Sequence, residues 1–156
     1  MPENLENRIQ KAVEYFMKGY GCGQSVVAAF ADLYGMDEAT ALKIGNGFGG
    51  GVGKMRMMCG AVSGLVILAG LDSGLSDDIR GGKAECYRLV QDLLEKFKQA
   101  NGSVICAELL GLTGKPTPGD FVPSERNAHY YKARPCAAKV ESAARIFAEY
   151  LQSKNR

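Results

Sequence analysis

Residues 45–71 read GNGFGGGVGKMRMMCGAVSGLVILAGL, a glycine-rich segment followed by an apolar one. Six of the nine residues at 45–53 are glycine, and each glycine inside a helix or strand costs about 1 kcal/mol relative to alanine, so a loop is predicted. The segment 59–70 is predicted to be a buried helix, because its apolar run is about half the ~20 residues of a membrane span. Gly60 and Gly64 share one face of this helix, where small residues let another helix pack closely.

Apolar residues recur at helical spacing on both sides of this segment. The predicted helices cover 5–18, 22–34, 38–44, 59–70, 80–99, 104–110 and 135–151. A loop rich in proline and glycine is predicted at 111–123. The chain has no pattern of alternating strands, no internal repeat and no linker between domains. We therefore expect one all-α domain over residues 1–156, a bundle of about six to seven helices with a glycine-rich loop.

The composition limits the class of protein. The chain has 156 residues, of which 46% are hydrophobic and 23% charged, as in globular proteins. Its 19 basic and 17 acidic residues are scattered, so we expect no nucleic acid partner. The first residues lack the basic leader and apolar run of a secretory signal, so we expect a cytoplasmic protein without membrane insertion. The face of Gly60 and Gly64 also suits a homodimer.

Five cysteines in a cytoplasmic chain are expected to stay reduced and to bind metal, react or fill the core. Four of them, Cys22, Cys59, Cys106 and Cys136, stand at or near the starts of predicted helices. Free N–H groups and the helix dipole favour a thiolate at such positions. We therefore predict that four helix starts converge on an anion-stabilising pocket. Cys86 lies inside a predicted helix and is expected to be a core residue.

The element Cys59-Gly60-Ala61-Val62-Ser63-Gly64, with a single Cys22 before it and single Cys106 and Cys136 after it, resembles a known family. This is the family of redox-active proteins named for its C, GCAxxG, C, C cysteine pattern. The resemblance covers about 5–150. It implies a helical domain with four functional cysteines and redox activity, without a defined reaction. The four cysteines at helix starts match the pattern, and Cys86 does not.

Two chemistries suit such a quartet. Four thiolates can hold an iron–sulfur cluster or a zinc ion, whereas two thiols can cycle between dithiol and disulfide without a cofactor. Helix dipoles supply only about 0.3–1 kcal/mol each, so several buried thiolates need a cation to offset their charge. The sequence therefore favours a metal or iron–sulfur centre on Cys22, Cys59, Cys106 and Cys136, for electron transfer or redox sensing with an unknown redox partner. A thiol–disulfide oxidoreductase and a structural or interaction module with core cysteines are the alternatives.

The glycine-rich loop is predicted to serve this site. Backbone N–H groups of Gly49, Gly50, Gly51 and Gly60 are expected to contact the sulfurs of a bound cluster. The alternative is a tight connection between helices. A dinucleotide-binding pattern, GxGxxG at 45–50, is set aside because a helix and not a strand is predicted before it.

Other residues near the cysteines carry weaker signals. Lys54 and Arg56 follow the glycine-rich loop and suit a small anion. His129 is the only histidine of the chain, and next to tyrosines it is expected at the surface rather than on a metal.

Overall fold

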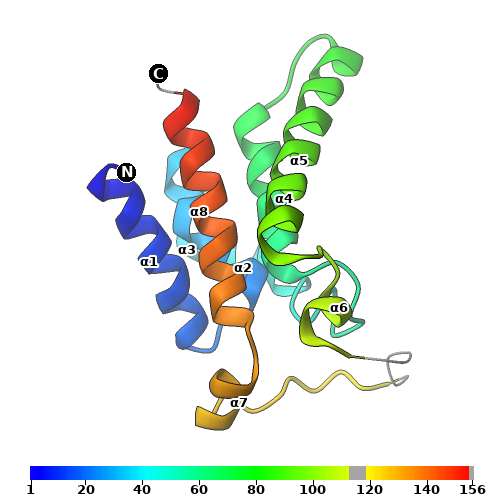
Figure 1. The fold of residues 1–156 in the computed structure, drawn as a ribbon. Coiled ribbons are helices and arrows are strands. Elements are labelled where there is room, and N and C mark those ends of the chain that lie inside the picture. Colours follow the sequence, from blue (N-terminus) through cyan, green and yellow to red (C-terminus); the bar gives the residue numbers. More distant parts are fainter. Residues whose placement is uncertain (113–118, 155–156) are drawn as a thin grey trace.

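The computed structural model describes residues 1–112 and 119–154, and within them it is all-α, as predicted (Figure 1). These residues form α1 (Glu3–Met17), α2 (Cys22–Phe30), the 3-10 helix η1 (Ala31–Tyr34), α3 (Glu38–Asn46), α4 (Gly60–Ser73), α5 (Ile79–Asn101), α6 (Cys106–Leu110), α7 (Ala128–Ala133) and α8 (Cys136–Lys154). No helix of the described chain has the length and apolar character that a membrane crossing requires.

Most helices begin and end near the predicted positions. The short helix α7 was not predicted, because its six residues are too few to show a helical period. The helix predicted from residue 104 begins at Cys106, since Ile105 is extended and forms an antiparallel bridge with Met58. The last helix begins at Cys136 rather than Pro135, whose carbonyl accepts the Lys139 N–H. Part of the loop predicted at 111–123 lies outside the described residues.

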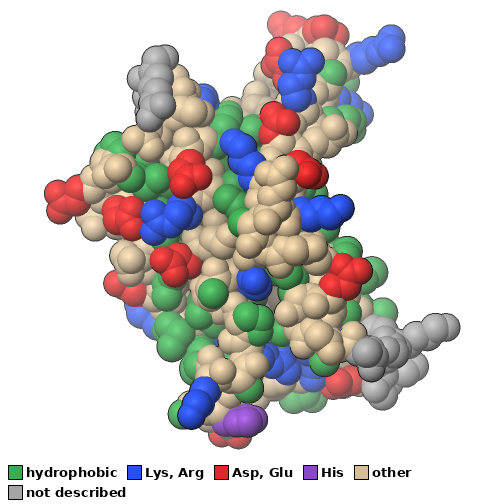
Figure 2. All heavy atoms as spheres, viewed as in Figure 1, with side chains coloured by type: hydrophobic (Ala, Val, Ile, Leu, Met, Phe, Trp, Pro, Cys, Tyr) green, Lys and Arg blue, Asp and Glu red, His purple; other side chains and the backbone are tan. Residues whose placement is uncertain are grey.

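The apolar helices α2 and α4 fill the centre of the bundle. Seven of the nine residues of α2 are buried, and the helix packs against α1, α3, α4 and α8. Around it α1 lies beside α8, and α5 contacts α4 and α8 (Figure 1). The rings of Phe30 and Phe147 meet edge to face at 5.0 Å and join α2 to α8. On the face shown in Figure 2, acidic and basic side chains are interspersed.

Glycines let α2 and α4 approach closely. A Cβ on Gly64 would lie 2.8 Å from the Val26 Cβ, and one on Gly60 would lie 3.2 Å from the Cys22 Cβ. Contacts under 3.0 Å do not occur between real Cβ atoms, so a side chain at Gly64 would push the helices apart. The predicted close packing on the Gly60 and Gly64 face is therefore confirmed, and its partner is α2 of the same chain. The contact brings the starts of α2 and α4 together.

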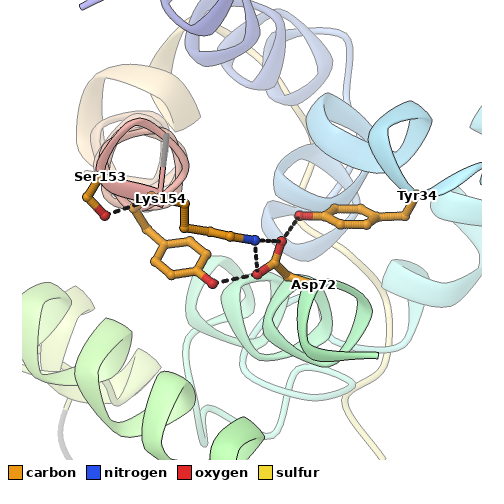
Figure 3. Close-up of polar contacts among 5 residues, drawn as sticks. Tyr34, Asp72, Ser153 and Lys154 are labelled. Carbon is orange, nitrogen blue, oxygen red and sulfur yellow. Dashed lines mark hydrogen bonds and ion pairs between the residues drawn. The ribbon is translucent and has the colours of Figure 1, made fainter. Parts of the chain in front are cut away.

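Asp72, in the last turn of α4, ties the other end of the bundle together (Figure 3). Its side chain is 6% exposed and accepts hydrogen bonds from the hydroxyl groups of Tyr34 (2.9 Å) and Tyr150 (2.5 Å) and from Lys154 Nζ (3.0 Å). Burial raises the pKa of Asp72, but the hydrogen bonds from Tyr150, Lys154 and Tyr34 outweigh it, so the pKa lies below the ordinary value. Because η1, which directly follows α2, and the ends of α4 and α8 meet at Asp72, the starts of α2, α4 and α8 lie at the opposite end of the bundle.

The Asp72→Asn variant is expected to lower the free energy of unfolding by about 1–3 kcal/mol at neutral pH, because an amide cannot accept all these bonds. The folded-state pKa is depressed, so this stabilisation is present above the unfolded-state pKa of about 3.9 and is lost as the pH falls through the folded-state value. Urea unfolding of both proteins at neutral and acidic pH measures the difference. The exposed Asp77→Asn is the control, and an equal deficit of Asp72→Asn at both pH values would contradict the assignment.

Candidate functional site

The four cysteines singled out in the sequence all stand where a helix starts. Cys22, Cys106 and Cys136 are the first residues of α2, α6 and α8, and Cys59 is the N-cap of α4. Cys59 and Cys106 are 6% and 8% exposed, Cys22 and Cys136 are half-buried, and all four are free thiols. Each therefore lies at the positive end of a helix, although in α6 the N–H groups of Cys106 and Ala107 donate to the carbonyls of Met57 and Arg56.

The four cysteines line one cavity of about 400 Å³. Its wall is built from the starts of α2, α4, α6 and α8, from the glycine-rich loop and from the segment that leads through α7 to α8. Gly49, Gly50, Gly51 and Gly60, which the sequence analysis assigned to cofactor binding, are in the same wall. The structure thus brings together all eight predicted site residues, from five separate parts of the chain.

The glycine-rich loop adopts a left-handed backbone next to the cysteines. Gly50 to Lys54 all have φ between 56° and 74°, and Arg56 has φ 60°. This conformation strains a β-branched residue such as Val52 by about 1–3 kcal/mol. The loop is closed by the N–H groups of Arg56 and Met57, which donate to the carbonyls of Gly50 and Gly51. A Cβ on Gly51 would lie 2.6 Å from the Cys106 Cβ, so the loop can contact α6 only with glycine there.

Cys22 and Cys136 line the same cavity and shift each other's pKa in opposite directions. The polar interaction with Cys22, the positive charges of Arg134 and Arg126 and the nearby Tyr130 hydroxyl outweigh burial and lower the pKa of Cys136 to about 6. The interaction with Cys136, burial and the nearby Cys59 raise the pKa of Cys22 well above its ordinary value. At neutral pH Cys136 is therefore the thiolate of the pair and Cys22 the thiol.

The other two cysteines differ from this pair. Burial raises the pKa of Cys59, although the backbone N–H groups of Val62 and Ala61 oppose it, so Cys59 is a neutral thiol at neutral pH. Cys106 Sγ accepts a hydrogen bond from Arg56 Nη1 at 3.6 Å. The four cysteines, which look equivalent in the sequence, are therefore unequal in charge and in contacts.

Two arginines that the sequence analysis did not single out contribute to the charge of the pair. Arg126 donates to the carbonyls of Phe16 (2.9 Å) and Tyr20 (3.0 Å), and its guanidinium lies 4.3 Å from the Phe16 ring centre. The Arg134 guanidinium lies 5.0 Å from the ring centre of Tyr130, in α7. The adjacency of Arg134 to Pro135 and Cys136 was a usable signal. No sequence signal pointed to Arg126, because its position beside the cysteines depends on how the segment around α7 folds.

Two residues discussed at the outset lie away from the cavity. The prediction that Cys86 belongs to the core is wrong: it is half-buried, and only Leu93 and Phe97 of α5 are buried, since the first half of α5 extends beyond the bundle (Figure 1). His129 is exposed on α7, as predicted, and Figure 2 shows the histidine at the surface.

The described residues do not form a metal site. Across 1–112 and 119–154, no three side chains of Cys, His, Asp or Glu are grouped so that they can bind one metal ion. The cysteines share a cavity, but they do not present the closed set of four ligands that structural zinc or an iron–sulfur cluster requires. The metal centre expected from the sequence stays a prediction.

One protein family matches the chain over residues 20–150, and its description reads "Putative redox-active protein (C_GCAxxG_C_C)". The matched region contains Cys22, Cys59, Cys106 and Cys136. At 59–64 the chain reads CGAVSG, so its cysteine precedes the glycine, whereas the printed pattern has glycine first. No curated protein and no solved structure matches the chain significantly.

Alkylation by iodoacetamide is expected to single out Cys136. Only thiolates react, so the rate at Cys136 should rise with pH to a plateau, with a midpoint near pH 6, while a thiol with an ordinary pKa of about 8.5 keeps gaining reactivity. In Arg134→Gln the midpoint should move upward, because one stabilising positive charge is lost. Peptide mapping by mass spectrometry follows each cysteine, with Cys86 as the internal control. A midpoint for Cys136 at or above the ordinary thiol value of about 8.5 would contradict the assignment.

Proposed function

Since this chain belongs to the C_GCAxxG_C_C family of redox-active proteins, we propose that it is a thiol–disulfide oxidoreductase in which Cys22 and Cys136 cycle between dithiol and disulfide. The observation that carries the proposal is that these two cysteines line one cavity, at the starts of α2 and α8, and shift each other's pKa so that one of them is ionised at neutral pH. Exchange needs a thiolate as nucleophile and a second thiol within reach to complete the reaction.

The roles of the two cysteines follow from their surroundings. Cys136 is the nucleophile, because Arg134 and Arg126 stabilise its negative charge and because it lines the cavity. Cys22 is the resolving thiol, because its raised pKa keeps it protonated until its neighbour has reacted. Once Cys136 is bonded to a substrate sulfur, its charge is gone, so the cause that most raises the pKa of Cys22 disappears.

The reaction balances as two exchange steps. The Cys136 thiolate attacks one sulfur of a substrate disulfide, the substrate S–S bond breaks, and a mixed disulfide and one thiolate form. Cys22 then attacks the Cys136 sulfur, the mixed disulfide breaks, and the second substrate thiolate leaves. The chain loses two electrons, which reduce the substrate disulfide to two thiols. One proton comes from Cys22 and the other from solvent, and the reverse reaction reduces the Cys22–Cys136 disulfide.

A metal or iron–sulfur centre on Cys22, Cys59, Cys106 and Cys136 is the second candidate, with electron transfer or redox sensing as its function. It is supported by the four thiols that line one cavity. For this function the four sulfurs would have to come closer together than in the described geometry. Zinc or an iron–sulfur cluster would be the cofactor.

Mild oxidation of the reduced protein by hydroxyethyl disulfide is expected to lower the number of free thiols from five to three. Peptide mapping should then find one disulfide, between Cys22 and Cys136. Cys22→Ser and Cys136→Ser should each abolish it, and Cys86→Ser should keep it, because Cys86 lies away from the cavity. Five free thiols after oxidation, or a disulfide between other cysteines, would refute the proposal.

Anaerobic purification with metal and acid-labile sulfide analysis separates the two candidates. The oxidoreductase proposal expects no stoichiometric metal. Stoichiometric iron and sulfide, or zinc, that is lost in Cys59→Ser would instead establish the metal centre, because Cys59 has no part in the exchange. Cys86→Ser is the matched control and should retain whatever metal the wild type holds.

A further inference from the structure

The geometry of the cavity points to its substrate class: we propose that the disulfide exchanged at Cys136 is a low-molecular-mass disulfide that carries carboxylates. This inference rests on the proposed exchange function. It concerns which molecule reaches the cysteine pair, so it can fail while the exchange itself stands.

The first observation is the charge of the wall. Five basic side chains line the cavity, and no Asp or Glu of the described residues does. They are Lys54, Arg56, Arg126, Arg134 and Lys139. The whole chain is nearly balanced, with 19 basic and 17 acidic residues, so composition does not explain this segregation. A hollow lined by one sign of charge attracts ligands of the opposite sign.

The second observation is that most of these charges are not neutralised. Among these five side chains, and within the described residues, only that of Lys54 pairs with a carboxylate, that of Asp120 at 2.9 Å. The other four bond to neutral acceptors or to sulfur: Arg126 to backbone carbonyls, Arg134 to Ser124 Oγ at 3.4 Å, Lys139 to Asn101 Oδ1 at 3.1 Å and Arg56 to Cys106 Sγ at 3.6 Å. These bonds orient the side chains and leave their charges available. The thiolate of Cys136 balances one of them.

The backbone of the glycine-rich loop adds donors to the wall. Gly49, Gly50 and Gly51 line the cavity, and their N–H groups donate to no backbone acceptor in the described residues. Successive N–H groups of this kind suit the oxygens of a carboxylate. The same loop keeps Val52 at a left-handed φ, so the surrounding contacts hold the shape of the loop in spite of backbone strain at Val52.

The third observation is size. A volume of about 400 Å³ lies within the ~300–1,000 Å³ typical of small-molecule sites. Cys136 stands in the wall of this hollow and not on a protruding surface, which suits a small disulfide better than one anchored in a folded protein. Apolar side chains of Leu109, Leu110 and Phe121 also line the cavity and suit the alkyl part of such a molecule.

Three disulfides of similar length and different charge test the inference: dithiodipropionate with two carboxylates, neutral hydroxyethyl disulfide, and cystamine with two ammonium groups. Acid-quenched mass spectrometry gives the rate of formation of the Cys22–Cys136 disulfide, and each rate is divided by that of the same reagent with 2-mercaptoethanol, an uncharged reference thiol. At low ionic strength the normalised rate should be at least about tenfold higher for dithiodipropionate than for cystamine, and salt should reduce the difference.

Variants of the wall should change this ratio. Lys139→Gln and Arg56→Gln are each expected to lower the preference for dithiodipropionate over cystamine by about threefold. The control is Lys83→Gln, an exposed basic residue outside the cavity, which should leave the preference unchanged. Equal normalised rates for all three reagents in the wild type would overturn the inference and leave the exchange function standing.

A second measurement is independent of exchange. Adipate, a dicarboxylate without sulfur, should slow the alkylation of Cys136 by iodoacetamide at least twofold, whereas hexanediol at matched ionic strength should not. Protection by adipate without any Cys22–Cys136 disulfide would refute the exchange function but support the anion-binding cavity. Equal effects of adipate and hexanediol would overturn anion binding.

Discussion

The close approach of the α2 and α4 backbones is the constraint on which the rest of the structure depends. Gly60 and Gly64 present no side chain to α2, so the two helices pack more closely than larger residues would allow. On the other side of α2 the same condition holds, because a Cβ on Gly45 would lie 2.7 Å from the Gln24 Cα. As a result the ends of α2, α3 and α4 that face the cavity are drawn together, and Cys22 and Cys59 share its wall.

Near this contact the structure limits the free-energy cost of burying ionised thiols. Four ionised thiols in one cavity would repel one another, and the structure avoids this because Cys22 and Cys59 stay protonated. The ionised one, Cys136, has arginines and a hydrogen-bond donor beside it. The general argument that a buried thiolate needs a nearby positive charge thus applies to this site. For Cys136 that charge comes from Arg134 and Arg126 of the same chain.

Helical spacing and cysteine position were enough to predict much of this. The helices from α1 to α6 and α8 follow from apolar periodicity, and all eight predicted site residues lie in one cavity wall. The left-handed backbone at Val52, Lys54 and Arg56 was beyond such reasoning, because these residue types disfavour it and only tertiary contacts impose it. The same is true of the inequality among the cysteines, since Arg126 acts on Cys136 through the fold and not through proximity in sequence.

The two proposed exchange cysteines lie far apart in the sequence, at the starts of α2 and α8. Their disulfide would close a loop that contains most of the chain, and in the chain-entropy model a loop of about 100 residues restricts the unfolded state by about 4–5 kcal/mol. The oxidised form gains this folding stability and the reduced form lacks it. The reduction potential of the pair and the stability of the bundle are therefore thermodynamically linked. A destabilised bundle would hold its disulfide less tightly, and the surrounding thiol pool would then influence how much of the protein remains folded.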